Sequence, residues 1–228
     1  MRPEQYDAWY ATRRGAWIGE QEYRLLESLL DPQPGETLLD AGCGTGYFTR
    51  RFAAGGGVGT VIGVDLDCDA LRFAAGRSCD GAAFVVANAC RLPFRDHSFD
   101  LVISVTALCF VREEQQALKE MLRVARRRVA VGLLNHHSLL YVLKGRGGGK
   151  GAYRGARWHS PEEVSALFGG LPARLVGMRT AILSPAGGPW SQRMEARLAQ
   201  LLPGSGGFIA AVAELAPDSL LNNLASHG

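Results

Sequence analysis

The stretch that decides the fold is Leu38-Leu39-Asp40-Ala41-Gly42-Cys43-Gly44-Thr45-Gly46-Tyr47-Phe48. Its apolar beginning predicts a buried strand, and its three glycines at alternating positions predict a tight turn into a helix. Glycine lacks a side chain, so the backbone of such a turn can come close to a ligand. A dinucleotide-binding loop reads Gly-x-Gly-x-x-Gly. Here the third glycine falls one position early, which weakens the case for a pyrophosphate site.

Strand-like and helix-like segments alternate along the chain on both sides of this loop. The predicted strands are Thr37–Ala41, Val58–Asp65, Ala83–Ala87, Asp100–Val105, Arg128–Leu134, Arg174–Leu183 and Phe208–Leu215. The predicted helices are Gly19–Leu30, Tyr47–Ala54, Asp69–Gly76, Glu113–Ala125, Pro161–Phe168 and Trp190–Leu202. This alternation favours a mostly parallel sheet with right-handed crossovers, hence a doubly wound α/β fold. Such folds bind ligands beyond the carboxyl ends of the strands, so the residues that follow each strand are site candidates.

The composition bounds the class of protein. The chain has 228 residues, 25 Lys and Arg against 22 Asp and Glu, and a net charge of +3, so charge alone indicates no polyanionic partner. No apolar run approaches the roughly 18 residues that cross a bilayer, and residues 1–10 contain no apolar signal core. An odd number of cysteines without a Cys-x-x-Cys pair argues against a disulfide framework or a zinc site. We expect one soluble cytoplasmic domain with no membrane contact and no metal.

The second predicted strand ends in an acid, Asp65, roughly 20 residues beyond the glycines. A carboxylate there offers two acceptor oxygens, enough for both hydroxyls of a ribose. Asp65 can also be interpreted as a surface turn or as the cap of the next helix. Asp67 is the better cap candidate, which leaves Asp65 for a ligand.

Two further segments complete the pattern. Phe84-Val85-Val86-Ala87-Asn88-Ala89-Cys90-Arg91-Leu92-Pro93-Phe94 follows, and then Ser98-Phe99-Asp100-Leu101-Val102-Ile103-Ser104. With these the chain resembles the class I S-adenosylmethionine-dependent methyltransferases, in particular the type 11 subgroup, which acts mostly on small molecules. The resemblance covers roughly residues 36–134, and the order of elements continues to about 216. It implies a seven-stranded sheet with helices on both faces, an antiparallel C-terminal hairpin strand, and S-adenosylmethionine as cofactor with S-adenosylhomocysteine as product.

The resemblance also implies a set of cofactor residues. In it the glycines pass beneath the amino-acid part of the cofactor, the acid after the second strand holds the ribose hydroxyls, and the next residue packs on the adenine. The family usually has Asp-Ala after the third strand, whereas this chain has Asn88-Ala89, so a charge-assisted contact to the adenine becomes a neutral one. The implied residues are Tyr10, Asp40, Gly42, Cys43, Gly44, Gly46, Asp65, Leu66, Asn88, Ala89 and Ser104.

The resemblance also implies a division of the chain into parts. We expect a single methyltransferase domain with five parts: a helical cap at 1–35, a cofactor-binding core at 36–134, a basic glycine-rich lid loop at 135–160, the C-terminal part of the sheet at 161–216 and a tail at 217–228. Tyr6, Trp9, Tyr10 and Arg13 share one face if the cap is a continuous helix. The run Arg126-Arg127-Arg128 is interpreted as a solvated turn at the edge of the sheet opposite the cofactor.

Acceptor and catalytic residues are less constrained by the sequence. Methyl transfer from a sulfonium requires mainly alignment and exclusion of water, and a general base is needed only for some nucleophiles. His136, His137 and His159 are the candidates for such a base, although loop hydrogen bonding explains the adjacent pair as well. The substrate candidates are Thr106, Asn135, Arg154 and Trp158, of which the last two can equally belong to a solvated loop.

The sequence leaves other functions open. Segment 144–159 is basic and contains Tyr153 and Trp158, a combination that could bind RNA through phosphate contacts and stacking. The chain lacks the Asn/Asp-Pro-Pro-aromatic and Pro-Cys motifs of two classes of enzyme that methylate nucleic-acid bases, which argues against those two classes. From the resemblance and the basic segment we expect a small, anionic or aromatic acceptor and no nucleic acid. A module that binds S-adenosylmethionine without turnover is a further alternative, and a nicotinamide-dependent oxidoreductase is the last.

Overall fold

The computed structural model describes residues 2–77, 79–184 and 201–215, together with residues 193, 195 and 197. Its strands are β1 (Thr37–Ala41), β2 (Thr60–Asp65), β3 (Ala82–Val86), β4 (Phe99–Val105), β5 (Ala125–Leu134), β6 (Ala173–Ala181) and β7 (Phe208–Leu215). Its α-helices are α1 (Pro3–Tyr10), α2 (Arg13–Leu30), α3 (Tyr47–Ala54), α4 (Cys68–Ala75), α5 (Glu114–Val124) and α6 (Pro161–Leu167). Most of the predicted Trp190–Leu202 helix and all of the 217–228 tail lie outside the described residues.

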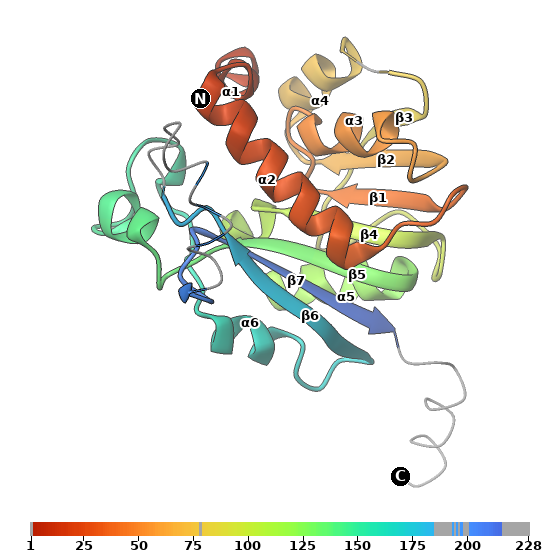
Figure 1. The fold of residues 1–228 in the computed structure, drawn as a ribbon. Coiled ribbons are helices and arrows are strands. Elements are labelled where there is room, and N and C mark those ends of the chain that lie inside the picture. The colour runs from red at the N-terminus through yellow and green to blue at the C-terminus, as the bar shows by residue number, and fades with distance from the viewer. Residues whose placement is uncertain are drawn as a thin grey trace, which may run out of the picture.

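The strands form one sheet in the order β3-β2-β1-β4-β5-β7-β6 (Figure 1). The first five strands are mutually parallel, and β7 runs antiparallel to both β5 and β6. The predicted doubly wound, mostly parallel sheet with an antiparallel C-terminal hairpin strand is therefore confirmed. The chain leaves β1 toward β2 and β3 on one side and returns to β4 on the other, so a switch point lies beyond the carboxyl ends of β1 and β4.

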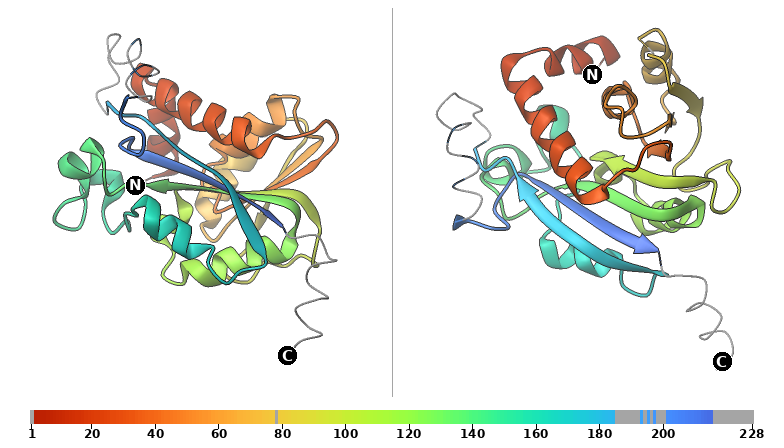
Figure 2. Two further views of the ribbon diagram at one scale, coloured as in Figure 1. Left: turned by 60° about the horizontal axis from the view of Figure 1, so that its bottom comes forward. Right: turned by 45° about the vertical axis from the view of Figure 1, so that its right-hand side comes forward.

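Helices cover both faces of the sheet (Figure 2). On one face α2 and α3 bury side chains such as Leu26 and Phe52 against Leu101. On the other face α5 and α6 bury Met121 and Val164 among the strands. Because the central strands are covered on both faces, their sequences are continuous apolar runs rather than alternating ones. This double burial fixes where each strand ends, and so where its following loop is presented.

The N-terminal helices differ from the prediction. Instead of a single helix from Gly19, the chain forms α1 and then α2, which starts at Arg13. The Thr12 hydroxyl accepts a hydrogen bond from Gly15 N (3.0 Å) and so caps α2. Arg13 therefore lies on a different helix from Tyr10, and the face that they were expected to share does not exist. Within the described residues, no helix has the length and apolarity that a membrane crossing needs.

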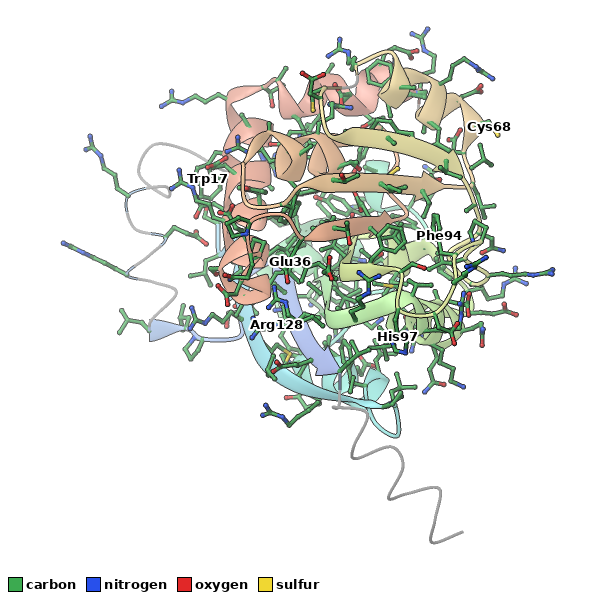
Figure 3. The ribbon with its side chains drawn as sticks, turned by 90° about the vertical axis from the view of Figure 1, so that its right-hand side faces the viewer. Trp17, Glu36, Cys68, Phe94, His97 and Arg128 are labelled. Carbon is green, nitrogen blue, oxygen red and sulfur yellow. The ribbon has the colours of Figure 1, made fainter. Side chains whose placement is uncertain are left out.

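The interpretation of residues 126–128 as a solvated turn is wrong, although their edge of the sheet is as expected. They are the start of β5, and the side chains of Arg127 and Arg128 reach the end of α2 and the segment after it. Figure 3 labels Arg128 and Glu36 in this region. Arg127 donates to both Glu36 oxygens, at 2.7 and 2.7 Å, and Arg128 donates to the carbonyl of Leu30 at 3.2 Å. The last carbonyls of a helix lack partners within the helix, so these arginines supply donors that solvent would otherwise provide.

Replacing Arg127 by Ala is expected to lower the free energy of unfolding by about 1–3 kcal/mol, because it removes a bidentate pair and a bond to the Asp31 carbonyl from a side chain only 27% exposed. Arg126→Ala is the matched control. That side chain is 53% exposed and makes a single 3.2 Å contact with Asp100, so a loss under about 0.5 kcal/mol is expected. Urea unfolding measures both, and equal losses would contradict the assignment.

Candidate cofactor and acceptor site

The glycine bend after β1 is shaped by backbone conformation and by close packing. Gly42 has φ 84° and Gly44 φ 54°, values that favour glycine over residues with a side chain. The N–H groups of Gly42 and Cys43 both donate to the carbonyl of Val64, at 2.7 and 2.9 Å, which folds the bend against the end of β2. A Cβ on Gly42 would lie 2.3 Å from the Cβ of Ala107, whereas one on Gly44 would meet nothing within 4 Å. The bend is therefore packed on one side and open on the other.

Asp40 lies beneath this bend. Its side chain is buried and accepts a hydrogen bond from the Thr49 hydroxyl at 2.7 Å. Burial, with a smaller contribution from the charge of Asp65, raises the pKa of Asp40 to about 7. The carboxyl therefore gains its charge near neutral pH.

Asp65 ends β2 and faces the same bend. One carboxylate oxygen accepts from Gly44 N at 2.7 Å, and the other accepts from Asp67 N at 2.9 Å. Each oxygen has a second lone pair, so both can still accept from a ligand's hydroxyls. Asp67 caps α4, since its Oδ1 accepts from the N–H groups of Asp69 and Ala70. The role of cap thus falls to Asp67, and the orientation of Asp65 is fixed from two sides.

The loop after β3 holds Asn88. Its Oδ1 accepts from Cys90 N at 2.8 Å, a local turn that an Asp side chain makes equally well. The carbonyl keeps one lone pair, and the side-chain amide is a further donor. Leu66, on the next loop along this edge of the sheet, is 64% exposed although it is apolar. Both side chains line a cavity beside the bend.

Two adjoining cavities lie at this end of the sheet. The larger, of about 1020 Å³, extends along the loops after β1, β2, β3 and β4. The smaller, of about 490 Å³, lies among α1, α2, the end of β5, the start of β7 and segment 140–153. Residues lining both are Tyr6, Tyr10, Thr106, Phe110, Gly151 and Ala152. The parallel strands in Figure 1 point toward this region, where α1 and segment 140–153 lie.

The sequence of this region matches a known family. Residues 39–131, from β1 to β5, match the family model described as "Methyltransferase domain". Residues 39–131 form a methyltransferase domain. A curated relative, the ubiquinone/menaquinone biosynthesis C-methyltransferase UbiE of Ectopseudomonas mendocina, is 39% identical over 107 residues. That alignment covers 44% of this chain and 42% of the relative, so the chain spans less than half the length of that protein.

Solved structures extend the likeness beyond the methyltransferase domain to the rest of the fold. A possible histamine N-methyltransferase of Thermotoga maritima, described as S-adenosylmethionine-dependent, has a TM-score of 0.71 at 24% identity, covering 93% of this chain and 96% of that one. The magnesium protoporphyrin IX methyltransferase of Synechocystis, solved with S-adenosylhomocysteine bound, has a TM-score of 0.63 at 18% identity, covering 90% and 86%. At these identities the likeness establishes the fold.

Most of the expected cofactor residues gather around the larger cavity. Those lining it are Tyr10, Asp40, Gly42, Cys43, Gly44, Asp65, Leu66, Asn88 and Ala89. Gly46 and Ser104 are not in the lining. A Cβ on Gly46 would meet the ring of Phe84 at 2.6 Å, and the buried Ser104 hydroxyl donates to the carbonyl of Ala41 at 2.7 Å. These two residues support the bend rather than face the cavity.

The expected acceptor and catalytic residues are more scattered. Thr106 lines both cavities and Arg154 the larger one. Asn135 is fully buried and donates to the carbonyls of Gly204 and Gly206, at 2.7 and 2.7 Å, so it holds the turn before β7. Trp158 packs against Tyr153. Neither Asn135 nor Trp158 lines either cavity.

The three histidines also lie outside both cavities. His136 and His137 are exposed on the loop after β5. His159 is 0% exposed, and its Nε2 lies 2.9 Å from a carboxylate oxygen of the buried Glu114. Arg157 pairs with the same Glu114, so this cluster anchors the end of the basic segment to α5.

Glu22 lines the smaller cavity from α2 and is absent from the site residues predicted from the sequence. A signal was present: Glu22 precedes Leu26 by four residues and Leu30 by eight, so it lies on the apolar face of its helix. A carboxylate at such a position is seldom fully buried without a partner.

Proposed function

We propose that the protein is an S-adenosylmethionine-dependent methyltransferase that binds its cofactor in the larger cavity and a small-molecule acceptor in the smaller one. The observation that carries the proposal is the junction of the two cavities beside the glycine bend. A donor and an acceptor bound on the two sides of Thr106 would meet without crossing solvent, which is the alignment that methyl transfer requires.

The chain's own groups fit the cofactor. The open side of Gly44 leaves room for its amino-acid part, the spare lone pairs of Asp65 suit the two ribose hydroxyls, and the exposed Leu66 offers an apolar surface for the adenine. Asn88 and Ala89 line the same cavity, which supports a contact of the Asn88 amide and the Ala89 backbone with the edge of that base. Bound there, S-adenosylmethionine would supply a methyl group attached to a positively charged sulfur. The rest of the molecule would be a good leaving group, because it departs as a neutral thioether.

The smaller cavity, called the acceptor chamber from here on, has the size and lining expected for a small-molecule acceptor. A volume of about 490 Å³ lies in the range of small-ligand pockets. Aromatic and aliphatic side chains form most of its wall: Trp9, Ile18, Phe110, Leu134, Leu140, Tyr153, Ile182 and Phe208. The similar UbiE methyltransferase is named for ubiquinone and menaquinone biosynthesis, and these walls suit an aromatic acceptor.

Calorimetric titration tests the cofactor and labelled methyl transfer tests the reaction. S-adenosylmethionine and S-adenosylhomocysteine are expected to bind, and NAD is expected not to. Label from S-adenosylmethionine is then expected in a small aromatic acceptor supplied in excess. Failure of both sulfur nucleosides to bind would contradict the proposal. Binding without transfer to any acceptor would favour a non-catalytic module instead.

A further inference from the structure

The smaller cavity is polarised along its length. Its outer part carries the exposed Lys144 and Lys150 and the partly exposed Arg14, while Glu22 is only 9% exposed. Arg14, Ile18 and Glu22 are spaced four residues apart on α2, so they share one helical face over about 12 Å. The chamber thus has a cationic mouth, an apolar middle and a single carboxyl at its inner end.

Glu22 has no partner in the part of the chain that the structure describes. No ion pair or hydrogen bond satisfies its side chain there, and burial alone raises its pKa to about 8. Burying an unpaired carboxyl is costly, and the fold gains nothing from this one that Gln or Met would not provide. Neighbouring carboxylates on the same helix are paired: Glu20 bonds Arg24 and Arg51, and Glu27 accepts from the Tyr23 hydroxyl. An unpaired group aimed into a cavity indicates that its partner is a ligand.

Glu22 is also close to the junction with the larger cavity. Its charge interacts with Tyr6 and Tyr10, which line both cavities, and with Tyr47 at the start of α3. A ligand group that contacts Glu22 therefore lies beside residues that line both cavities.

We infer that Glu22 is the general base of the reaction and that the acceptor is an aromatic or apolar acid with an ionisable hydroxyl, a phenol or enol, held against Glu22. The inference rests on the proposed function. The cationic mouth favours an anionic substituent at the outer end and disfavours an ammonium group, which the positively charged donor would also repel. The hydroxyl is then the proton-bearing group that pairs with the carboxyl.

The step balances with these groups alone. The hydroxyl proton passes to the Glu22 carboxylate, and the electron pair that it leaves makes the acceptor nucleophilic at oxygen or at a ring carbon conjugated with it. That atom bonds to the methyl carbon while the carbon–sulfur bond breaks, and its electron pair stays on sulfur as a neutral thioether. For attack by carbon, the ring proton of the resulting dienone passes to solvent and a proton from solvent returns to the oxygen, which restores the aromatic ring and the hydroxyl. Glu22 then returns its proton to solvent.

Among the titratable groups that face the acceptor chamber in the described residues, Glu22 is the one expected to change its charge near pH 8. The titratable side chains coupled to it are Tyr6 and Tyr10 from α1, Tyr47 from α3 and Tyr153 from segment 151–153. Burial raises the pKa of each of these tyrosines above its ordinary value of 10, to about 12 for Tyr153. The charged groups Arg14, Lys144 and Lys150 lie toward the mouth. The rate is therefore expected to rise with pH and to level off above about 8, as Glu22 becomes ionised.

The test uses a hydroxynaphthoate as acceptor, with the aminonaphthoate and the unsubstituted naphthoate as analogues, and compares the wild-type protein with Glu22→Gln and Glu20→Gln. Glu20→Gln is the control, because it removes a carboxylate from the same helix at a residue that lines neither cavity. The rate of methyl transfer to the hydroxynaphthoate is followed from about pH 6 to about pH 9, a range that brackets the expected inflection. Hydroxynaphthoate binding is measured separately by fluorescence, and S-adenosylhomocysteine binding by calorimetry.

Glu22→Gln is expected to slow transfer by about 100-fold or more and to abolish the inflection near pH 8. The affinity for S-adenosylhomocysteine should be unchanged and the affinity for the acceptor within a few-fold. Glu22→Asp is expected to keep the inflection at reduced rate, which a merely structural role would not produce. A pH–rate profile of Glu22→Gln that matches the wild-type profile overturns the inference. So does methylation of the aminonaphthoate in preference to the hydroxynaphthoate. Failure of the wild-type protein to bind the hydroxynaphthoate overturns it as well. Failure of the wild-type protein to bind S-adenosylhomocysteine would instead count against the proposed function.

Discussion

Asp65→Ala is expected to lower the affinity for S-adenosylhomocysteine by about 100-fold or more. Two hydrogen bonds from ribose hydroxyls to a carboxylate, each contributing about 1.5–3 kcal/mol, correspond to a loss of this size. Asp65 is oriented for them because Gly44 and Asp67 hold its carboxylate through their backbone N–H groups. Calorimetric titration measures the loss.

The control for this prediction is Asp67→Ala. It removes a carboxylate two residues away that caps α4 and lines neither cavity, so it is expected to lower stability by about 1 kcal/mol and to leave cofactor affinity unchanged. A deoxyribose analogue of the ligand separates the ribose contact from the bond to Gly44. Once Asp65 is replaced, loss of the ligand hydroxyls should cost little further affinity. Full affinity in Asp65→Ala would refute the assignment.

Glu22→Gln is expected to stabilise the fold at neutral and alkaline pH while impairing catalysis. Burial raises the pKa of Glu22 from 4.5 to about 8. Below about pH 4.5 the carboxyl is neutral in the folded and unfolded chains alike, so it imposes no penalty. Between that pH and about 8 the unfolded chain releases a proton that the folded chain retains, so stability falls as pH rises. The total loss is on the order of several kcal/mol, at about 1.4 kcal/mol per pKa unit.

Gln cannot titrate, so its stability advantage over the wild type should grow from pH 4.5 and reach its maximum above about pH 8. Glu20→Gln should have the opposite sign. Burial opposes ionisation of Glu20, but hydrogen bonds from Arg24 and Arg51 lower its pKa overall, so its contribution is present at neutral pH and is lost as pH falls. Urea unfolding at several pH values measures both, and a pH-independent difference between the wild type and Glu22→Gln would show that Glu22 is not held neutral by the fold.

The local pattern at the glycine bend was enough to predict a large part of the molecule. An apolar run, alternating glycines and an acid at the end of the next strand are short-range features, and each determines the structure of its own segment. They therefore predicted β1, β2, α3 and the position of Asp65 facing the bend. Element boundaries shifted where a distant partner intervened. β5 starts at Ala125 rather than Arg128, for example, because the arginines there pair with Glu36 and with the end of α2.

The sequence by itself determined the sheet and the cofactor side of the site, because strand ends in a doubly wound fold meet at one edge whatever the loops contain. Only the tertiary structure decided the acceptor side. Its wall combines α1, α2, the end of β5 and segment 140–153, which are far apart in the chain, and no local pattern states that they enclose one chamber. The same packing buried His159 against Glu114 and, within the described residues, left Glu22 unpaired inside that chamber. A side chain's partners depend on which elements pack around it.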